Sequence, residues 1–439
     1  MNTRSIWSQK VHEQANAYSL ASMRILFMLF WFIYLSHDNI QALKYLDWSL
    51  FHEFGISHLI PDDLWKVTHE AGLFVYLKYG LIFASIWVAT GGKHARGVLI
   101  AFSIGISFYL SYTKGFGGHT NHQELTLTYC TYTLIALPCF NSLSLKQSNS
   151  VNNTGNASIY RASMIVLCLI VITQYVFIGL ARTAIGFPGT FAPEVMETWL
   201  AQRALRPNPW EFGFVYWFVQ FPELRAVIPV LLPVSTILEV AAPAMLFMRY
   251  RWAFIFALLF AGFHLSILAL MNIPFLENIA VLCVFLPIGE YLQRYFAKSE
   301  NQKRKALLFF DGDCSLCHGF IRFVFKWETT ENISFAPLQG DTFKEVSASG
   351  YPERLSGVDS IIFYDQRTQK FYAFSDGIIL TLKSMGGLWH LPAFLLKLLP
   401  KPLRDFGYKF VASVRFRIFG EAKEACRLPT KNEQQRMLN

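Results

Sequence analysis

Charged residues are scarce in this sequence: Asp, Glu, Lys and Arg make up 16% of its 439 residues, against about 25% in an average soluble domain. Cysteine is scarce as well, and seven residues are too few for a small protein held together by disulfides. Aromatic residues are plentiful, with 41 Phe and 11 Trp, which excludes a disordered chain. A hydrophobic content of 53% therefore predicts that part of the protein faces lipid rather than water.

Long apolar runs follow one another from Ser19 to about Tyr291. Eight of them are near the length that crosses about 30 Å of hydrocarbon, and they cover residues 20–37, 71–90, 97–113, 123–140, 162–180, 227–248, 252–271 and 274–291. A buried helix of a soluble protein is the alternative for any single run. Beyond Lys305 the apolar runs shorten to strand length. We therefore predict a polytopic α-helical membrane bundle of about eight spans at 1–297, a basic linker at 298–305 and an α/β domain at 306–439.

The net charge of +9 has a definite place along the chain. Basic residues occur in every segment that eight alternating spans put on the N-terminal side, namely Arg4, Lys10, Lys93, Arg96, Lys146, Arg161, Arg249, Arg251, Arg294, Lys298, Lys303, Arg304 and Lys305. The opposite segments are more acidic or mixed. Because Lys and Arg favour the cytoplasmic side, both termini are expected in the cytoplasm and the protein in a bacterial-type inner membrane. The positive net charge then indicates how the chain is oriented in the membrane and does not indicate nucleic-acid binding. The first eighteen residues have no cleavable signal pattern, so residues 20–37 are expected to act as an uncleaved anchor.

A CxxC motif follows an apolar, strand-like run in the C-terminal domain. The run ends in Asp311, Gly312 and Asp313, and Cys314 and Cys317 open a segment whose apolar residues recur at helical spacing. A thiol at the start of a helix is stabilised as a thiolate by free backbone N–H groups and by the helix dipole. We expect Cys314, nearer the helix start, to be the more exposed cysteine and the attacking thiol. Cys317 would then resolve the mixed disulfide.

Three other interpretations of this motif stay open. The pattern CxxCH is also the attachment site of c-type haem, but haem is attached outside the cytoplasm, where the charge pattern does not put His318. A zinc site would use Cys314, Cys317, His318 and Cys426. The two cysteines are also compatible with an inert, buried position in a packed helix.

The region around the motif resembles the DCC family of thiol-disulfide-oxidoreductase-like domains. The resemblance covers about residues 304–430 and depends on Asp311, Cys314, Cys317, Phe335–Gln339, Ser360–Phe363, Ser375-Asp376, Pro402–Asp405, Phe419-Gly420 and Cys426–Pro429. It implies a thioredoxin-like α/β fold in which Asp311, Cys314 and Cys317 are the defining residues. One departure concerns the strand that faces the CxxC, which usually follows a cis-proline. Here Val358-Asp359 precede it, which argues against general exchange with protein disulfides.

Ionisable residues also occur in and beside the apolar runs, where they are costly and usually face a cavity or a partner. They are Lys114, His119, His122 and Glu124 near the outer end of two runs, Arg182 after the run at 162–180, Glu239 inside 227–248 and His264 inside 252–271. Glu239 and His264 are expected to pair across adjacent helices. Arg182 and the His/Glu cluster are expected to converge at the outer leaflet. A simple hydrogen bond between helices is the alternative for Glu239 and His264.

The membrane part resembles the HTTM domain, which includes the membrane part of vitamin K-dependent gamma-carboxylase. The resemblance covers about residues 15–295 and depends on Arg24, Asn121-His122, Tyr175–Arg182, Phe263-His264, Phe275 and Phe285–Pro287. In the carboxylase a lysine acts as base on the reduced quinone, and the best match to it here is Arg182. An arginine is too weak an acid to serve as that base, although it can bind a quinone oxygen or an anion. Glutamate carboxylation is therefore not expected.

Taken together, these features predict a membrane-bound thiol-disulfide oxidoreductase-like protein. The dithiol would exchange with a cytoplasmic thiol protein or a small thiol, and the bundle would bind a quinone or another lipophilic substrate near His122, Arg182 and His264. Membrane lipid is an expected partner; nucleic acid and a metal are not. The alternatives are a non-redox lipid or small-molecule transferase or a partner-binding module, each with a regulatory DCC domain, and a carboxylase-like enzyme that modifies a peptide.

Overall fold

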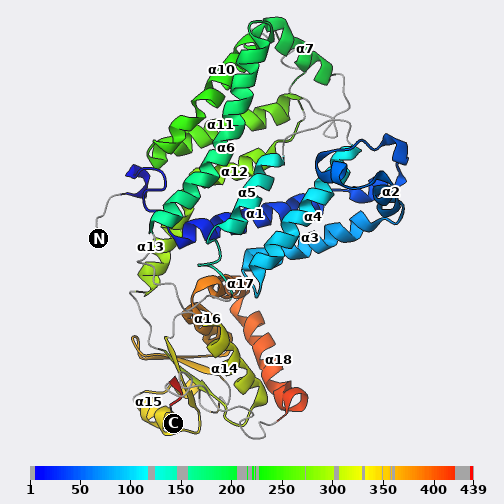
Figure 1. Cartoon of the computed structure of the whole chain (residues 1–439). Coiled ribbons are helices and arrows are strands. Elements are labelled where there is room, and N and C mark those ends of the chain that lie inside the picture. Colours follow the sequence, from blue (N-terminus) through cyan, green and yellow to red (C-terminus); the bar gives the residue numbers. More distant parts are fainter. Residues whose placement is uncertain are drawn as a thin grey trace. The chain divides into compact units, whose positions relative to one another are not determined.

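The structure is a computed structural model of the chain (Figure 1). It describes residues 5–116, 124–145, 157–204, 215, 220–221, 223, 227–271, 273–300, 306–328, 332–348, 350–355, 357, 361–420 and 436–438. Two compact units share these residues. The first, the helical unit, lies within Met1–Ser142 and Val151–Arg294, and the second, the C-terminal unit, lies within Leu143–Ser150 and Tyr295–Asn439.

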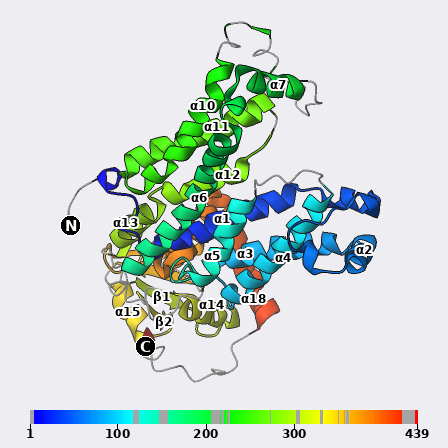
Figure 2. The same ribbon diagram turned by 45° about the horizontal axis from the view of Figure 1, so that its top comes forward.

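The described residues of the helical unit form helices joined by turns and loops, with one isolated β-bridge between Lys10 and Arg249. Its α-helices are α1 (Ala17–His37), α2 (Asp62–Glu70), α3 (Leu73–Thr90), α4 (Ala95–Gly115), α5 (Leu125–Ala136), α6 (Ala157–Gly186), α7 (Pro193–Ala204), α10 (Ile228–Ala241), α11 (Tyr250–Met271), α12 (Leu276–Val281) and α13 (Ile288–Glu300), the last of which continues into the C-terminal unit. Short 3₁₀ helices connect them: η1 (Ile6–Ser8), η2 (Ile40–Tyr45), η3 (Trp48–Leu50), η4 (Gly55–Leu59), η5 (Gly189–Phe191), η6 (Ala242–Leu246) and η7 (Leu282–Phe285). Figure 2 shows α1, α3 and α4 packed together, and α6 packed on α10.

Six helical segments are long and apolar enough to cross a bilayer. They are α1, α3, α4, α6, α11 and the continuous segment Pro229–Leu246, and they coincide with six of the eight predicted spans. Several of their large apolar side chains point outward, for example Phe83 and Phe177, which are 67% and 73% exposed. Outward apolar side chains on helices of this length are compatible with a multi-pass membrane protein.

The other two predicted spans have a different form. Helix α5 has 12 residues, about 18 Å at 1.5 Å per residue, and it ends directly before Leu137 and Pro138. A residue that precedes proline is disfavoured in the helical conformation. The last run is a pair of helices, Leu276–Phe285 and Ile288–Tyr295, bent by 55°. Pro287 lies in the break, where its missing N–H interrupts the hydrogen-bond ladder. The total of eight spans therefore remains a prediction.

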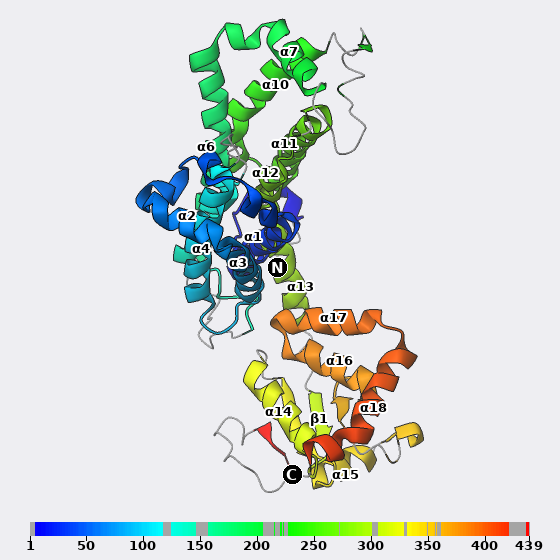
Figure 3. The ribbon, with the colours of Figure 1, turned by 90° about the vertical axis from the view of Figure 1, so that its right-hand side faces the viewer.

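The C-terminal unit is a small mixed sheet with helices on both faces (Figure 3). Its elements are β1 (Ala306–Phe310), α14 (Ser315–Trp327), β2 (Ile333–Pro337), α15 (Asp341–Ala348), η8 (Glu353–Leu355), β3 (Ile362–Asp365), β4 (Lys370–Ala373), α16 (Phe374–Met385), η9 (Gly387–Trp389), α17 (His390–Leu398) and α18 (Lys401–Phe419). The strand order is β2-β1-β3-β4. Strands β1 and β2 are parallel, with Leu308 opposite Phe335, and β3 is antiparallel to both β1 and β4.

Strand β1 is buried on both faces, which is why every one of its five residues is apolar. On one face, Leu308 and Phe310 pack with residues of α14 and α16. On the other, Leu307 and Phe309 pack with Phe343 of α15. This double burial fixes the end of β1, where Asp311 and the CxxC begin.

Candidate functional site

The CxxC motif lies at the junction of β1 and α14, the strand-to-helix position that the sequence predicts. Cys314 is the N-cap of α14 and has extended backbone angles, with φ −100° and ψ 113°. Its Sγ accepts a hydrogen bond from the backbone N–H of Cys317 at 3.3 Å. The backbone N–H of Cys314 in turn donates to the carbonyl oxygen of Asp311 at 3.3 Å. A negative charge on Cys314 would thus be stabilised by a free N–H group at the positive end of the helix.

The predicted difference in exposure between the two cysteines is wrong. Cys314 is 1% exposed and Cys317 is 4% exposed, so Cys314 is not the more accessible one. The reason is that both side chains turn inward and join the apolar core between the sheet and α14. Position at the start of a helix favours a thiolate, but it does not by itself place the sulfur at the surface.

The thiol of Cys317 is difficult to ionise. Burial raises its pKa to about 12, and the hydrogen bond to Cys314 and the negative charge of a Cys314 thiolate act in the same direction. The nearby positive charge of Arg415 acts in the opposite direction. Cys317 therefore keeps its proton at neutral pH.

Asp311 is the centre of a buried polar network next to the thiols. Its Oδ2 forms an ion pair with Nη2 of Arg415 at 3.1 Å, and both side chains are almost fully buried. Its Oδ1 accepts hydrogen bonds from the backbone N–H of Asp313 at 3.0 Å and from Nε2 of Gln339 at 3.2 Å. The amide oxygen of Gln339 accepts the N–H of Gly312 at 3.3 Å. Asp311 thus holds the loop between β1 and Cys314 in one shape.

Asp313 and His318 have lesser parts in this geometry. The side chain of Asp313 is exposed, and the residue contributes its backbone N–H to Asp311. Nε2 of the His318 ring lies 2.8 Å from the carbonyl oxygen of Gly312. Because a carbonyl oxygen only accepts, Nε2 of His318 carries the proton of this bond. No group of three or more His, Cys, Asp and Glu residues suited to a metal ion occurs in the described residues; Cys426 lies outside them.

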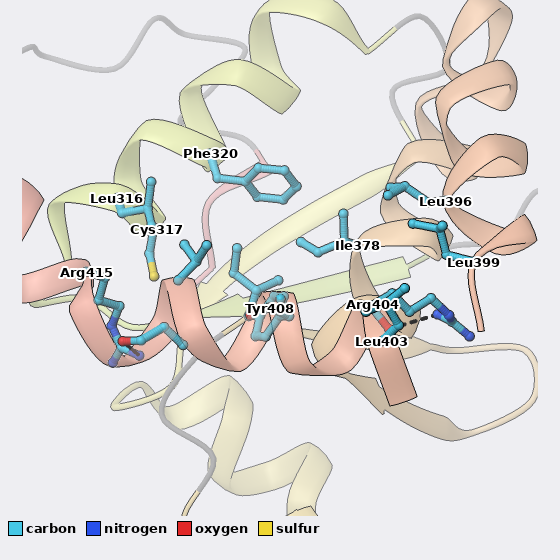
Figure 4. Close-up of a pocket in the computed structure, with 15 residues that line it drawn as sticks. Leu316, Cys317, Phe320, Ile378, Leu396, Leu399, Leu403, Arg404, Tyr408 and Arg415 are labelled. Carbon is cyan, nitrogen blue, oxygen red and sulfur yellow. Dashed lines mark hydrogen bonds between the residues drawn. The ribbon is translucent and has the colours of Figure 1, made fainter. Parts of the chain in front are cut away.

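An elongated cavity of about 490 Å³ opens beside Cys317 (Figure 4). Residues of α14, α16, α17 and α18 line it, together with Ile361, and its lining is almost entirely apolar. Figure 4 shows Cys317 and Arg415 at one end and Leu396, Leu399 and Arg404 at the other. Cys317 lines this cavity, so the second thiol of the motif borders a space large enough for a small molecule.

A cluster of charged and polar side chains lies at the other end of the cavity. It joins the start of α16 (Ser375 and Asp376) to the start of α18 (Lys401, Arg404 and Asp405), and so brings together two of the motifs that carry the family resemblance. Nη1 of Arg404 lies 2.8 Å from Ser375 Oγ and 2.7 Å from Asp376 Oδ1. Lys401 pairs with Asp376, and with Asp405 at 3.1 Å. This cluster, which we call the α16–α18 clamp, fixes the helix that carries Arg415.

In the helical unit, Arg182 and Glu239 form an ion pair. Nη1 of Arg182 lies 2.7 Å from Oε2 of Glu239, whose side chain is 2% exposed. Gly179, one helical turn before Arg182, makes the pair possible. A Cβ at Gly179 would come within 3.1 Å of the Glu239 side chain and 2.9 Å of Val240, so its absence lets α6 and α10 approach closely.

The predicted pairing of Glu239 with His264 is therefore wrong. Glu239 faces Arg182, because α10 packs against α6. His264 is buried on α11, and its Nε2 lies 3.0 Å from the hydroxyl of Tyr175 on α6. The two helices α10 and α11 each turn their polar residue toward α6 and not toward one another. A cavity of about 110 Å³ lies beside Arg182, with Trp199 and Phe263 in its wall.

Glu124 belongs to a separate polar cluster. Its carboxylate lies 2.7 Å from Nζ of Lys114 and accepts a hydrogen bond from the hydroxyl of Tyr34 at 3.0 Å. His119 and His122, which the sequence places with this cluster, lie outside the described residues, as do Val358-Asp359. The predicted convergence of these histidines with Arg182 stays a prediction.

Cys168 is fully buried, and its Sγ lies 3.1 Å from Nε2 of His12.

Arg415 is the functional candidate that sequence reasoning missed. It lies 104 residues from Asp311 in the chain, and pairing over that distance leaves no local pattern. One signal is present. Arg415 comes directly after the mostly apolar stretch Phe410–Val414, and it lies eleven residues, or three helical turns, after Arg404. Residues so spaced lie on one face of a helix.

Comparisons with known proteins match the C-terminal part of the chain. Residues 308–421 match the family model described as DCC1-like thiol-disulfide oxidoreductase. The chain is 35% identical over 141 residues to the uncharacterized protein YuxK of Bacillus subtilis (strain 168), which is 32% of this chain and 98% of that protein. It is 30% identical over 131 residues to the DCC family protein At1g52590, chloroplastic, of Arabidopsis thaliana, which is 29% of this chain and 72% of that protein. No solved structure matches.

Proposed function

Because the chain belongs, through its C-terminal unit, to the family of DCC1-like thiol-disulfide oxidoreductases, we propose that Cys314 and Cys317 exchange electrons with a disulfide or thiol partner. The observation that carries the proposal is the position of Cys314 as the N-cap of α14, with the N–H of Cys317 directed at its sulfur. The mixed sheet, with helices on both faces and the CxxC directly after β1, supports the thioredoxin-like fold that the resemblance implies.

The exchange would follow the usual two steps. The Cys314 thiolate attacks one sulfur of the partner's disulfide, which forms a mixed disulfide and expels the first partner thiolate. Cys317 then attacks Sγ of Cys314, and its proton passes to the second departing thiolate. The dithiol loses two electrons, and the partner's disulfide is reduced to one thiolate and one thiol; the thiolate takes up the proton that Cys314 released when it ionised. The raised pKa of Cys317 supports this order, because Cys317 stays protonated until the second step.

The same proposal places the helical unit in a bacterial-type inner membrane with both termini in the cytoplasm. The six long apolar segments and their outward apolar side chains support a membrane location. For coupling to the bundle the exchange would run in reverse: two thiols of the partner reduce the Cys314–Cys317 disulfide and become a disulfide themselves. A quinone or another lipophilic substrate would then accept the two electrons and two protons of the dithiol. A groove of about 660 Å³ between α5 and α6, which includes Thr126 and Gln174, has the size of a ligand site. The cavity beside Arg182, at about 110 Å³, is smaller than such sites usually are. The likeness of this unit to the HTTM domain remains a prediction.

The experiment that tests thiol exchange uses the full chain in lipid nanodiscs. The variant Cys317→Ser lacks the resolving thiol and should accumulate a mixed disulfide at Cys314 when a small disulfide such as oxidised glutathione is added. Peptide mass spectrometry would locate it. The matched control Cys314→Ser should accumulate none at Cys317. Equal or absent labelling in both variants would exclude this role and favour the non-redox alternatives, a transferase or a partner-binding module.

A second measurement addresses the quinone. Protein purified with its native lipid would be extracted, and any quinone identified by mass spectrometry. A stoichiometric quinone whose addition oxidises the dithiol of the wild-type protein supports coupling. If the dithiol of active protein stays reduced with excess quinone, the coupling is wrong while the thiol exchange stands.

A further inference from the structure

The outer faces of α17 and α18 carry an unusual number of exposed apolar side chains. On α17 they form a stripe at helical spacing, Leu391, Phe394, Leu395 and Leu398, each more than half exposed. On α18 the exposed apolar side chains are Leu403, Phe406, Phe410, Val411, Phe416 and Ile418. We call these two sets, with Leu399 between them, the α17–α18 surface. A water-facing helix surface normally carries polar residues at these positions.

The charges of this segment have one predominant sign. Residues 390–419 include six basic residues, Lys397, Lys401, Arg404, Lys409, Arg415 and Arg417, and one acidic residue, Asp405. Arg404 and Arg415 are engaged within the unit, whereas Lys397, Lys409 and Arg417 are exposed. Exposed aromatic and aliphatic side chains flanked by Lys and Arg are the pattern of helices that lie in the headgroup layer of an anionic bilayer.

The surface is continuous with the cavity at Cys317. Leu399, Leu403 and Val411 belong to both, since each lines the cavity and is 44% to 58% exposed. Figure 4 shows Leu399 and Leu403 at the end of the cavity that lies farther from Cys317. An apolar chain that enters between α17 and α18 would therefore reach toward the thiol along an apolar wall.

We propose that the α17–α18 surface docks on the anionic lipid surface of the membrane and opens the Cys317 cavity toward the bilayer. The inference rests on the proposed membrane location of the helical unit, but it does not require thiol chemistry. Its consequence is that a lipophilic molecule can reach the dithiol from the lipid, without any path through the helical unit. The covering group is lipid rather than an acidic protein face, because the surface combines eleven exposed apolar side chains with only four exposed basic residues, of which Lys401 is already paired with Asp376.

The test uses full-length protein in nanodiscs of phosphatidylethanolamine and phosphatidylglycerol. Incorporation of the protein, read by size-exclusion chromatography, separately reports whether the helical unit inserts. The photoreactive residue benzoyl-phenylalanine would replace Phe394 or Phe410, and a matched control would carry it at Glu345. Glu345 is exposed on α15, which covers the opposite face of the sheet. After illumination, mass spectrometry would identify what each position has captured.

We expect lipid adducts at positions 394 and 410 and none above background at 345. Each of the variants Lys397→Gln and Arg417→Gln should lower the adduct yield about fivefold, the equivalent of about 1 kcal/mol for each basic residue at the surface. Lys344→Gln on α15 should leave it unchanged. A variant with both Cys314→Ser and Cys317→Ser should give the same adducts as the wild-type cysteines, which separates docking from thiol exchange. Adducts to peptides of the helical unit, or no adducts at 394 and 410, would overturn the proposal.

Discussion

Nη2 of Arg415 lies 3.1 Å from Oδ2 of Asp311, and the two side chains are 4% and 7% exposed. The pair joins the last turns of α18 to the loop that precedes the CxxC. Since a buried charge is costly without a partner, each side chain compensates the burial of the other. The geometry of the thiols is thereby tied to a helix that begins more than eighty residues later in the chain.

Removal of one member of this pair should destabilise the C-terminal unit. In Arg415→Met, Asp311 keeps a buried charge without its cation, and we expect a loss of about 3–5 kcal/mol in the free energy of unfolding. The double variant Asp311→Asn with Arg415→Met leaves no unpaired charge and should recover a large part of that loss. Resistance of the C-terminal unit to limited proteolysis in the full-length protein would measure both. If the double variant loses as much stability as Arg415→Met and Asp311→Asn lose together, the two side chains do not depend on one another, which would contradict the pairing.

The second prediction concerns the alkylation of Cys317. Because burial raises the pKa of its thiol to about 12, Cys317 should stay unreactive toward iodoacetamide at pH 8 and become reactive only as the pH rises well above the ordinary value of about 8.5. Cys314→Ser keeps the effect of burial and should show the same late rise. Peptide-resolved mass spectrometry separates Cys317 from the other cysteines. Half-maximal labelling near pH 8.5 in the folded protein would contradict this prediction.

The raised pKa also has a consequence for stability. A thiol whose pKa is higher in the folded than in the unfolded state favours folding when it is protonated, so its contribution is complete below about pH 8.5 and declines as the pH approaches 12. Between pH 8 and 11, the free energy of unfolding of the reduced C-terminal unit should therefore fall more steeply with pH in the wild type than in Cys317→Ser.

Much of the fold follows from short-range patterns in the sequence. Apolar run length predicts eight spans, and six of them coincide with helical segments long enough to cross a bilayer. The other two contain Pro138 and Pro287, where the helix ends early or bends, and run length alone does not take these prolines into account. The strand-to-helix junction at Cys314 follows from a change of period at Asp311. Each of these features is determined by residues that are close together in the chain.

The partners of buried polar residues could not be predicted in this way. Arg415 reaches Asp311, and Glu239 reaches Arg182, through the packing of helices that are distant in sequence. The orientation of α10 toward α6 depends on the close approach at Gly179, which run length and composition do not reveal. The burial of Cys314 likewise depends on the direction of its side chain and not on its position in the motif.

The third prediction concerns the α16–α18 clamp. Burial alone would raise the pKa of Asp376, but the hydrogen bonds and charges of Lys401 and Arg404 outweigh it and hold the pKa below its ordinary value. The contribution of this carboxylate is present above about pH 4 and is lost as the pH falls through the lowered pKa. The wild-type C-terminal unit should therefore melt at lower temperature below pH 4. The melting temperature of Asp376→Asn should be lower than that of the wild type at pH 7 and should vary less between pH 3 and 6. The same pH dependence of the melting temperature in both proteins would argue against the clamp.

The ion pair of the helical unit gives the last prediction. In Arg182→Met, the carboxylate of Glu239 stays buried at 2% exposure without its cation, and the apparent melting temperature of the detergent-solubilised protein should fall by several degrees. Arg182→Lys keeps a positive charge within reach of Glu239, so its melting temperature should fall less, although the variant loses the fixed geometry of the guanidinium. Glu239→Gln combined with Arg182→Met removes both charges and should recover most of the loss. Fluorescence-detected size-exclusion chromatography after heating would compare the three variants. If Arg182→Met melts like the wild type, the ion pair with Glu239 does not contribute to the stability of the helical unit.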